Sequence, residues 1–220
     1  MGRAAALHAP FPLDGRQVRW CEVTEPALIV GSAQPGEMVD GAASVAAGLE
    51  VVRRRSGGAA VVVGPGRLVW ADVVIPVGDP LWVDDVGVAP LWVGEWWAEA
   101  VRSFGIGPVS VSTTMVHGPL SRLVCFAGRG PGEVICGARK LVGVSQRRTR
   151  RAALFQVALL LHWDPDEAVA GLAVGPVGRA RVARELAALA VGADELVGRP
   201  VGAPEVEEAV RLALPDGPSE

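Results

Sequence analysis

The spacing of hydrophobic residues changes near residue 163 and divides the chain into a strand-rich part and a helical part. The short apolar run at 26–31, which ends in glycine, is typical of a buried strand, and 48–58 predicts a strand that leads into a glycine loop. In the segment 153–163 every odd position is apolar, and this alternation also predicts a strand. Two β-rich runs within 59–77 surround a Gly-Pro-Gly turn, a pattern that predicts a hairpin.

The region between these strands contains one predicted helix and two further predicted strands. Residues 92–104 carry apolar side chains at helical spacing, and Gly105 follows as a stop signal. The two segments 122–126 and 133–145 are rich in β-forming residues, so they predict strands, the second folding back at Gly137-Ala138. The tryptophans of the helix are expected to pack in the core.

A helix start signal separates the two parts of the chain. Asp164 can cap a helix, Pro165 suits its first turn, and apolar residues then recur at helical spacing. We therefore divide the chain into an N-terminal lead-in at 1–16, a core at 17–165 and a helical C-terminal segment at 166–220. The pattern contains no internal repeat.

Composition and charge narrow the classes of function. Half of the residues are hydrophobic and a fifth are charged, which is typical of a folded globule. The net charge of −3 argues against nucleic acid or an anionic membrane as a partner. Three irregularly spaced cysteines favour neither a disulfide framework nor a metal site, so we expect a reduced, cytoplasmic protein, and a monomer. We find no secretory leader and no apolar run long enough to span a bilayer.

The first stretch with chemical potential is RRRSGGAA, at residues 53–60. Consecutive small residues let backbone N–H groups approach an anionic ligand closely. On a strand, Arg54 would point to the opposite face from Arg53 and Arg55, so at least one of the three arginines can clamp a phosphate or carboxylate. A solvated basic edge beside a glycine turn is the alternative. The stretch matches neither a Walker loop nor a dinucleotide-binding fingerprint.

The second stretch is GARKLVGVSQRR, at residues 137–148, and it contains Lys140, the only lysine among 21 basic residues. A lysine ammonium is compact and can lie between a phosphate and a carbonyl oxygen, where it would stabilise developing negative charge. Chance survival of one lysine codon remains the alternative. Lys140 and its neighbouring arginines also form a basic cluster, which is either a solvated face or a landing surface for an acidic or phosphate-bearing partner.

Together these stretches resemble the lipoate–protein ligases. RRRSGGAAV resembles the first motif of that family, GARKLVGVSQRR resembles its second, and the upstream PALIVGSAQP is similar to the segment before the first. Order and spacing agree from about residue 17 to 165, so the core at 17–165 is identified as a biotin/lipoate-protein ligase catalytic domain. The resemblance implies an α+β fold in which a mixed, largely antiparallel β-sheet is flanked by helices.

The resemblance also implies an activity and a site. An ATP-dependent ligase would activate lipoate or octanoate as an acyl-adenylate, using ATP and Mg²⁺, and pass the acyl group to a lysine of a lipoyl carrier domain. The implied carriers are the glycine cleavage H protein and the E2 subunits of 2-oxoacid dehydrogenases. Lys140 is the implied catalytic residue at the carboxyl–phosphate junction, with no metal-ligating residues in the protein. The implied substrate- and nucleotide-binding residues are Arg54, Ser56, Gly57, Gly58, Ala59, Ala60, Val61, Val62 and Lys140.

A related branch, the octanoyltransferases, uses a nucleophilic cysteine fifteen residues before the motif lysine. Cys125 has this spacing to Lys140, Phe126 follows it, and Glu133 matches a glutamate of the same segment. A Cys125 thiolate would take an octanoyl group from a thioester and pass it on without ATP. The alternative is a small buried cysteine on a strand. His117 is either a partner for the thiolate or a loop histidine.

Three hypotheses therefore remain open from the sequence. The SGGAA loop and the lysine motif favour the ATP-dependent ligase over the Cys125 octanoyltransferase. A third hypothesis is a non-catalytic acyl-binding homologue, because Ala59 replaces a glycine of the first motif and the N-terminal segment is short. No cofactor is expected to be bound tightly.

Overall fold

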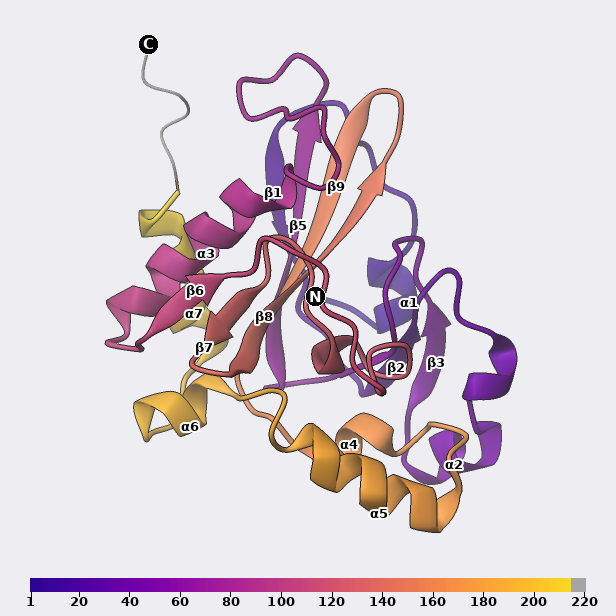
Figure 1. Ribbon diagram of the computed structural model, residues 1–220. Coiled ribbons are helices and arrows are strands. Elements are labelled where there is room, and N and C mark those ends of the chain that lie inside the picture. The colour runs from indigo at the N-terminus through magenta and orange to yellow at the C-terminus, as the bar shows by residue number, and fades with distance from the viewer. Residues whose placement is uncertain (215–220) are drawn as a thin grey trace.

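Two β-sheets form the centre of the molecule in the computed structural model, which describes residues 1–214 (Figure 1). The larger sheet contains, in spatial order, β1 (Gln17–Trp20), β5 (Leu68–Pro76), β9 (Ala152–Leu160), β8 (Arg139–Arg148), β7 (Val134–Cys136) and β6 (Val109–Val111). All neighbouring strands in it are antiparallel. The smaller sheet contains β3 (Glu50–Arg53), β2 (Ala27–Val30) and β4 (Val61–Val63), with β2 parallel to β3 and antiparallel to β4. The predicted mixed, largely antiparallel arrangement is confirmed.

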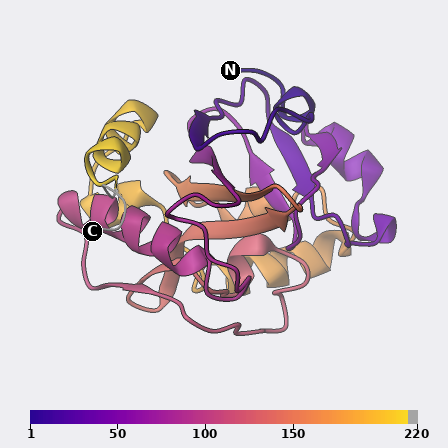
Figure 2. The same ribbon diagram turned by 90° about the horizontal axis from the view of Figure 1, so that it is seen from above.

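Helices cover the outer faces of both sheets. Helices α3 (Pro90–Ser103) and α7 (Ala203–Leu212) contact each other and the larger sheet, and they lie at the end of the molecule away from the smaller sheet (Figures 1 and 2). Helices α4 (Pro165–Val169) and α5 (Gly175–Leu186) cover the smaller sheet, and α4 contacts β4. The remaining helices are α1 (Ala4–Leu7), α2 (Gly41–Ala46) and α6 (Ala193–Val197), with short 3₁₀ turns at Gly36–Met38 and Cys125–Ala127.

Strand β2 is buried on both faces because the smaller sheet lies between two hydrophobic cores. Ile29 faces the larger sheet and joins its core, while Leu28 and Val30 join the core beneath α4 and α5. This explains the continuous apolar run at 26–31, since a strand covered on both sides has no polar face. The space between the two sheets is therefore enclosed by aliphatic side chains.

Several predicted elements are observed. The helix predicted at 92–104 is α3, and Gly105 follows it at φ +75°, a conformation that favours glycine. The strand predicted at 153–163 is β9, and Asp164 caps α4 by accepting hydrogen bonds from the first-turn N–H groups. The helical segment predicted at 166–220 contains α5, α6 and α7, and its residues 215–220 lie outside the described part of the chain.

The predicted hairpin within 59–77 is wrong. Strand β4 pairs with β2 in the smaller sheet, whereas β5 pairs with β1 and β9 in the larger one. The Gly-Pro-Gly turn therefore carries the chain from one sheet to the other. Because β5 has better partners along its nine residues, it does not pair with the three-residue β4.

The strand predicted at 122–126 is also wrong. Residues in this segment form turns and a 3₁₀ helix, and its one strand-like contact is an isolated parallel bridge between Val124 and Ala60.

None of the helices in residues 1–214 has the length and apolar character needed to cross a membrane.

Candidate active site

Residues from both sequence motifs line one open cleft between the two sheets, although Ser56, Ala60, Val61 and Val62 do not. The cleft has a volume of about 470 Å³ and is bordered by the loop after β3, the 3₁₀ turn and strand β8. The lining residues that the sequence analysis named are Arg54, Gly57, Gly58, Ala59, His117, Cys125, Glu133 and Lys140. Ser145 and Gln146 of β8 also line the cleft. Two separate sequence motifs therefore meet in space.

Lys140 is held inside the wall of this cleft. Its side chain is 1% exposed, and its Nζ donates hydrogen bonds to the carbonyl oxygens of Cys125 (2.8 Å) and Gly128 (3.2 Å) and to Oε1 of Glu133 (2.6 Å). The Phe126 ring lies 5.0 Å from Nζ. The three N–H groups are thus directed at protein oxygens, and the ammonium ties the 3₁₀ turn to β8.

Glu133 completes a buried ion pair that sequence analysis did not identify. Its side chain is 8% exposed, and while Oε1 accepts from Lys140, Oε2 accepts from the Gly130 N–H at 2.7 Å. Burial raises the pKa of the Glu133 carboxyl, and the opposing effect of Lys140 and the hydrogen bonds does not cancel it. The spacing from Cys125 selected this residue in the sequence, but the pairing with Lys140 had no local signal.

Cys125 is the first residue of the 3₁₀ turn and is directly connected to the glycine loop. Its N–H donates to the Ala60 carbonyl at 2.7 Å, and the Ala60 N–H donates to the Leu123 carbonyl at 3.2 Å. The side chain is half-buried and borders two spaces, the open cleft and a narrow apolar slot of about 40 Å³ between the sheets. Cys125 therefore lies where an apolar acyl chain in the slot would meet a polar group in the cleft.

The other two cysteines have the character of buried structural residues. Burial raises the pKa of Cys21 to about 12, with further contributions from nearby Asp72, and it raises the pKa of Cys136 to about 11. Neither lines the cleft or the slot. His117 lines the cleft and is exposed, and within residues 1–214 no hydrogen bond joins its imidazole to Cys125.

Arg53 and Arg54, which precede the glycine loop, form hydrogen bonds to backbone carbonyl oxygens of the protein. Arg54 is buried while Arg53 and Arg55 are exposed, as the alternation along β3 predicts. The Arg54 guanidinium donates to the Ala59 carbonyl at 2.9 Å, and Arg53 donates to the Gly31 carbonyl at 2.8 Å. These bonds point the guanidinium groups at backbone carbonyls.

Two glycines allow the loop to pack this closely. Gly58 has φ +98°, and a Cβ on it would lie 2.5 Å from Nη2 of Arg54. A Cβ on Gly31 would lie 1.8 Å from the Gly58 carbonyl oxygen. Glycine is required at both positions because a side chain would push the loop away from β2 and from the buried arginine.

A buried polar row lies beneath the loop. Ser56 Oγ donates to Gln156 Oε1 at 2.7 Å, and Ser145 Oγ donates to Ser56 Oγ at 3.2 Å. Gln156 Nε2 continues the row to Asp72 Oδ1 at 3.0 Å. Of the predicted loop residues, Ser56 is thus anchored in protein, Ala60 is tied to the turn that carries Cys125, and Val61 lines the slot. Val62 pairs with Leu28 in the smaller sheet and lines neither the cleft nor the slot.

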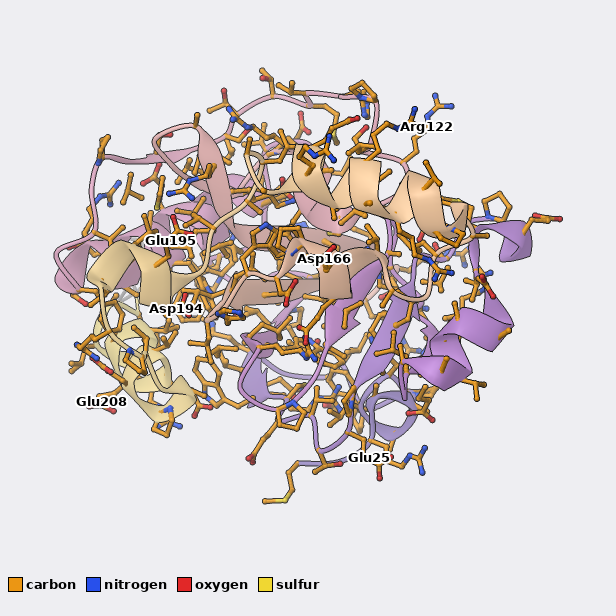
Figure 3. All side chains as sticks on the ribbon, turned by 90° about the horizontal axis from the view of Figure 1, so that it is seen from below. Glu25, Arg122, Asp166, Asp194, Glu195 and Glu208 are labelled. Atoms are coloured by element: carbon orange, nitrogen blue, oxygen red, sulfur yellow. The ribbon has the colours of Figure 1, made fainter. Side chains whose placement is uncertain are left out.

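The predicted basic cluster is divided, because Lys140 is buried and does not belong to the surface. Arg139 pairs with Glu195 of α6 at 2.6 Å, and Glu195 is labelled in Figure 3 beside Asp194 of the same helix. Arg148 donates to the Val83 carbonyl, with its guanidinium 4.3 Å from the Trp82 ring.

Within residues 1–214, no group of three or more His, Cys, Asp or Glu side chains is arranged to hold a metal ion.

Comparison with known proteins gives a family match over nearly all of the described chain. Residues 7–214 match the family model described as the lipoyl protein ligase A/B catalytic domain. The octanoyltransferase LipM of Kyrpidia tusciae is 32% identical over 193 residues, which cover 84% of this chain and 69% of that protein. The octanoyltransferase LipM of Moorella thermoacetica is 28% identical over 201 residues, covering 90% and 72%.

Solved structures show the same fold. A bipartite lipoate protein ligase from Thermoplasma acidophilum, described with its E2 lipoyl domain, superposes with a TM-score of 0.69 at 21% identity, covering 91% of this chain and 70% of that one. A lipoate-protein ligase A bound with ATP superposes with a TM-score of 0.67 at 22% identity, covering 91% and 71%.

Proposed function

Because the chain belongs to the lipoyl protein ligase A/B catalytic domain family, and is therefore an enzyme of that family, we propose that it is an octanoyltransferase that carries the acyl group on Cys125. The observation that carries this proposal is the position of the thiol, which borders both the apolar slot and the open cleft. The two LipM relatives support the same choice. The sequence motifs alone had favoured the ligase.

The proposed reaction has two acyl transfers. The Cys125 thiol loses its proton, the resulting thiolate attacks the carbonyl carbon of an octanoyl thioester, and the donor leaves as a thiolate that takes up that proton, which leaves an octanoyl thioester on Cys125. The ε-amine of a lysine on a lipoyl carrier domain then attacks that thioester, an amide forms, and the Cys125 thiol is restored with the proton lost by the amine. Neither step requires ATP.

The surrounding residues have distinct proposed roles. The slot takes the octanoyl tail, which leaves the carbonyl group at its mouth beside Cys125. The loop with Gly57, Gly58 and Ala59 forms the opposite wall of the cleft, where donor and acceptor enter in turn. Lys140 positions the nucleophile, because its ammonium donates to the Cys125 carbonyl oxygen and so fixes the turn that carries the thiol.

The partner in the second step is proposed to be a lipoyl carrier domain. The description of the Thermoplasma ligase with its E2 lipoyl domain supports this class of partner. The volume of the cleft, about 470 Å³, is also much larger than that of the slot, about 40 Å³, so the cleft can admit a lysine side chain that extends from a folded domain.

The ATP-dependent ligase is the second candidate, and one observation favours it. The loop 56–60 retains the small residues of the ligase motif and borders the cleft, and a structure of the same fold is described with ATP bound. In that case the adenylate would lie in the cleft with its acyl chain in the same slot, and Mg²⁺ would accompany the nucleotide. Cys125 would then be dispensable.

Intact-mass analysis of a lipoyl domain separates the two candidates. The domain is incubated with this protein and either octanoyl carrier protein without ATP, or octanoate with ATP and Mg²⁺. We expect octanoylation with the first donor, its loss in Cys125→Ala, and its retention in the matched control Cys136→Ala. Transfer that requires ATP and survives Cys125→Ala would replace the proposal with the ligase. The absence of transfer from both donors would favour the non-catalytic acyl-binding homologue.

A further inference from the structure

The slot behind Cys125 has small residues along its floor and one very large residue at its far end. In the register of the larger sheet, Gly143 of β8 lies opposite Ala158 of β9, and Ala158 lies opposite Trp70 of β5. All three residues line the slot. A Cβ on Gly143 would lie 3.4 Å from the Phe126 ring, so this glycine marks the end of the slot next to Cys125.

The distance across this row matches a medium-length acyl chain. From β8 to β5 the row crosses two strand spacings of about 4.8 Å, or roughly 10 Å in total. Seven carbon–carbon bonds of about 1.5 Å in an extended zigzag span about 9 Å. An octanoyl chain anchored at Cys125 and extended over Gly143 and Ala158 therefore ends against the Trp70 indole.

Trp70 is fixed in this position from two sides. Its Nε1 donates to Oδ1 of Asp72 at 2.9 Å, and Asp72 is fully buried and also accepts from Gln156 and Arg19. The His8 ring lies against the indole, with the ring centroids 4.6 Å apart. The indole cannot rotate away without breaking a hydrogen bond inside the protein, so the end of the slot is rigid.

We propose that Trp70 sets the upper limit of acyl chain length at about eight carbons, by closing the slot two strands away from Cys125. This inference rests on the proposed function, because it takes the slot to be the acyl site. It adds a residue that determines specificity and that is not part of either sequence motif.

The test measures transfer of hexanoyl, octanoyl, decanoyl and dodecanoyl groups from carrier protein to a lipoyl domain by intact mass. Trp70→Ala and Trp70→Leu open the end of the slot. Each additional methylene that moves from water into the opened slot favours binding by about fourfold, so the decanoyl-to-octanoyl ratio should rise on the order of tenfold. Trp96→Ala is the matched control, since Trp96 is similarly buried and also donates one indole hydrogen bond, but lies on α3 outside the slot.

The opposite change guards against a variant that fails to fold. Ala158→Val narrows the middle of the slot and should shift the preference from octanoyl toward hexanoyl. An unchanged chain-length profile in folded Trp70→Leu, or in Ala158→Val when the tryptophan variants do not fold, overturns the role of Trp70 even if octanoyl transfer is intact.

Failure of the proposed function gives a different result. If the wild-type protein transfers no acyl group, thermal stabilisation by free octanoate, decanoate and dodecanoate still reports the length of the slot. Stabilisation that peaks at octanoate in the wild type and moves to dodecanoate in Trp70→Leu upholds the length limit while the transferase proposal fails. A peak that does not move refutes the limit.

Discussion

The buried pair of Lys140 and Glu133 permits a quantitative test. Both side chains are almost completely buried, at 1% and 8% exposure, and their charged atoms lie 2.6 Å apart. Removing one partner of such a pair leaves a buried charge without compensation, which costs about 3–5 kcal/mol of stability. Replacing both partners with uncharged side chains of similar size removes the desolvation cost as well, and is often neutral.

We therefore expect strong coupling in a double-mutant cycle. Lys140→Met and Glu133→Gln should each lower the free energy of unfolding by about 3 kcal/mol, which corresponds to a drop in Tm of roughly 6–12 °C for a domain of this size. The double variant should be no less stable than either single variant. Urea unfolding at fixed pH measures all four proteins, and a double variant whose loss equals the sum of the two single losses would refute the reasoning.

The same cycle separates stability from catalysis. Burial raises the pKa of Glu133, so without Lys140 the carboxyl is readily protonated as the pH falls, and the neutral form carries no uncompensated charge. Lys140→Met should therefore lose less stability at about pH 5 than at about pH 8. The double variant should fold and yet transfer no acyl group, because the ammonium that holds the nucleophile is absent.

Three further outcomes follow from the site. Burial lowers the pKa of His8 from 6.5 to about 4, so as the pH falls through this range the unfolded chain binds a proton that the folded protein does not. The free energy of unfolding should therefore decrease by up to about 3 kcal/mol as the pH falls from 6.5 to about 4. His8→Phe should flatten this part of the pH–stability curve in urea unfolding. Iodoacetamide should label the native protein at Cys125 only, and peptide mapping that finds either buried cysteine labelled at a comparable rate would contradict the burial argument. Gly31→Ala should abolish acyl transfer because its Cβ would collide with the Gly58 carbonyl, whereas Gly36→Ala, whose Cβ meets open space outside the cleft and the slot, should retain it in the same mass assay.

The sequence was most informative where burial imposes a local pattern. Alternation over 153–163 predicted β9, and helical spacing with a glycine stop predicted α3, because each element presents one continuous face to the same core. Lys140 and the glycine loop, which the two motifs selected, line one cleft, and their role in it stays a prediction. These features depend on the chain within a few residues of the position concerned, or on a resemblance that covers both motifs.

Pairing between distant segments was not predictable in this way. The runs on either side of the Gly-Pro-Gly turn have the pattern of a hairpin, but β4 pairs with β2, more than thirty residues away. Likewise 122–126 has the composition of a strand, yet its backbone finds a single strand-like partner at Ala60. Glu133 was missed as a partner of Lys140, because the two side chains meet only when β7 and β8 are placed in register.

The single lysine has a chemical consequence for an enzyme that is proposed to acylate lysines. A protein that holds an activated acyl group is exposed to modification of its own surface amines. Here the only ε-amine is 1% exposed, is paired with Glu133 and donates hydrogen bonds to three oxygens, so an acyl group cannot reach it. All the other members of the Lys and Arg set are arginines, whose guanidinium groups form no stable amide with such an acyl group. No lysine of this chain therefore competes for the intermediate with the lysine that arrives on another protein.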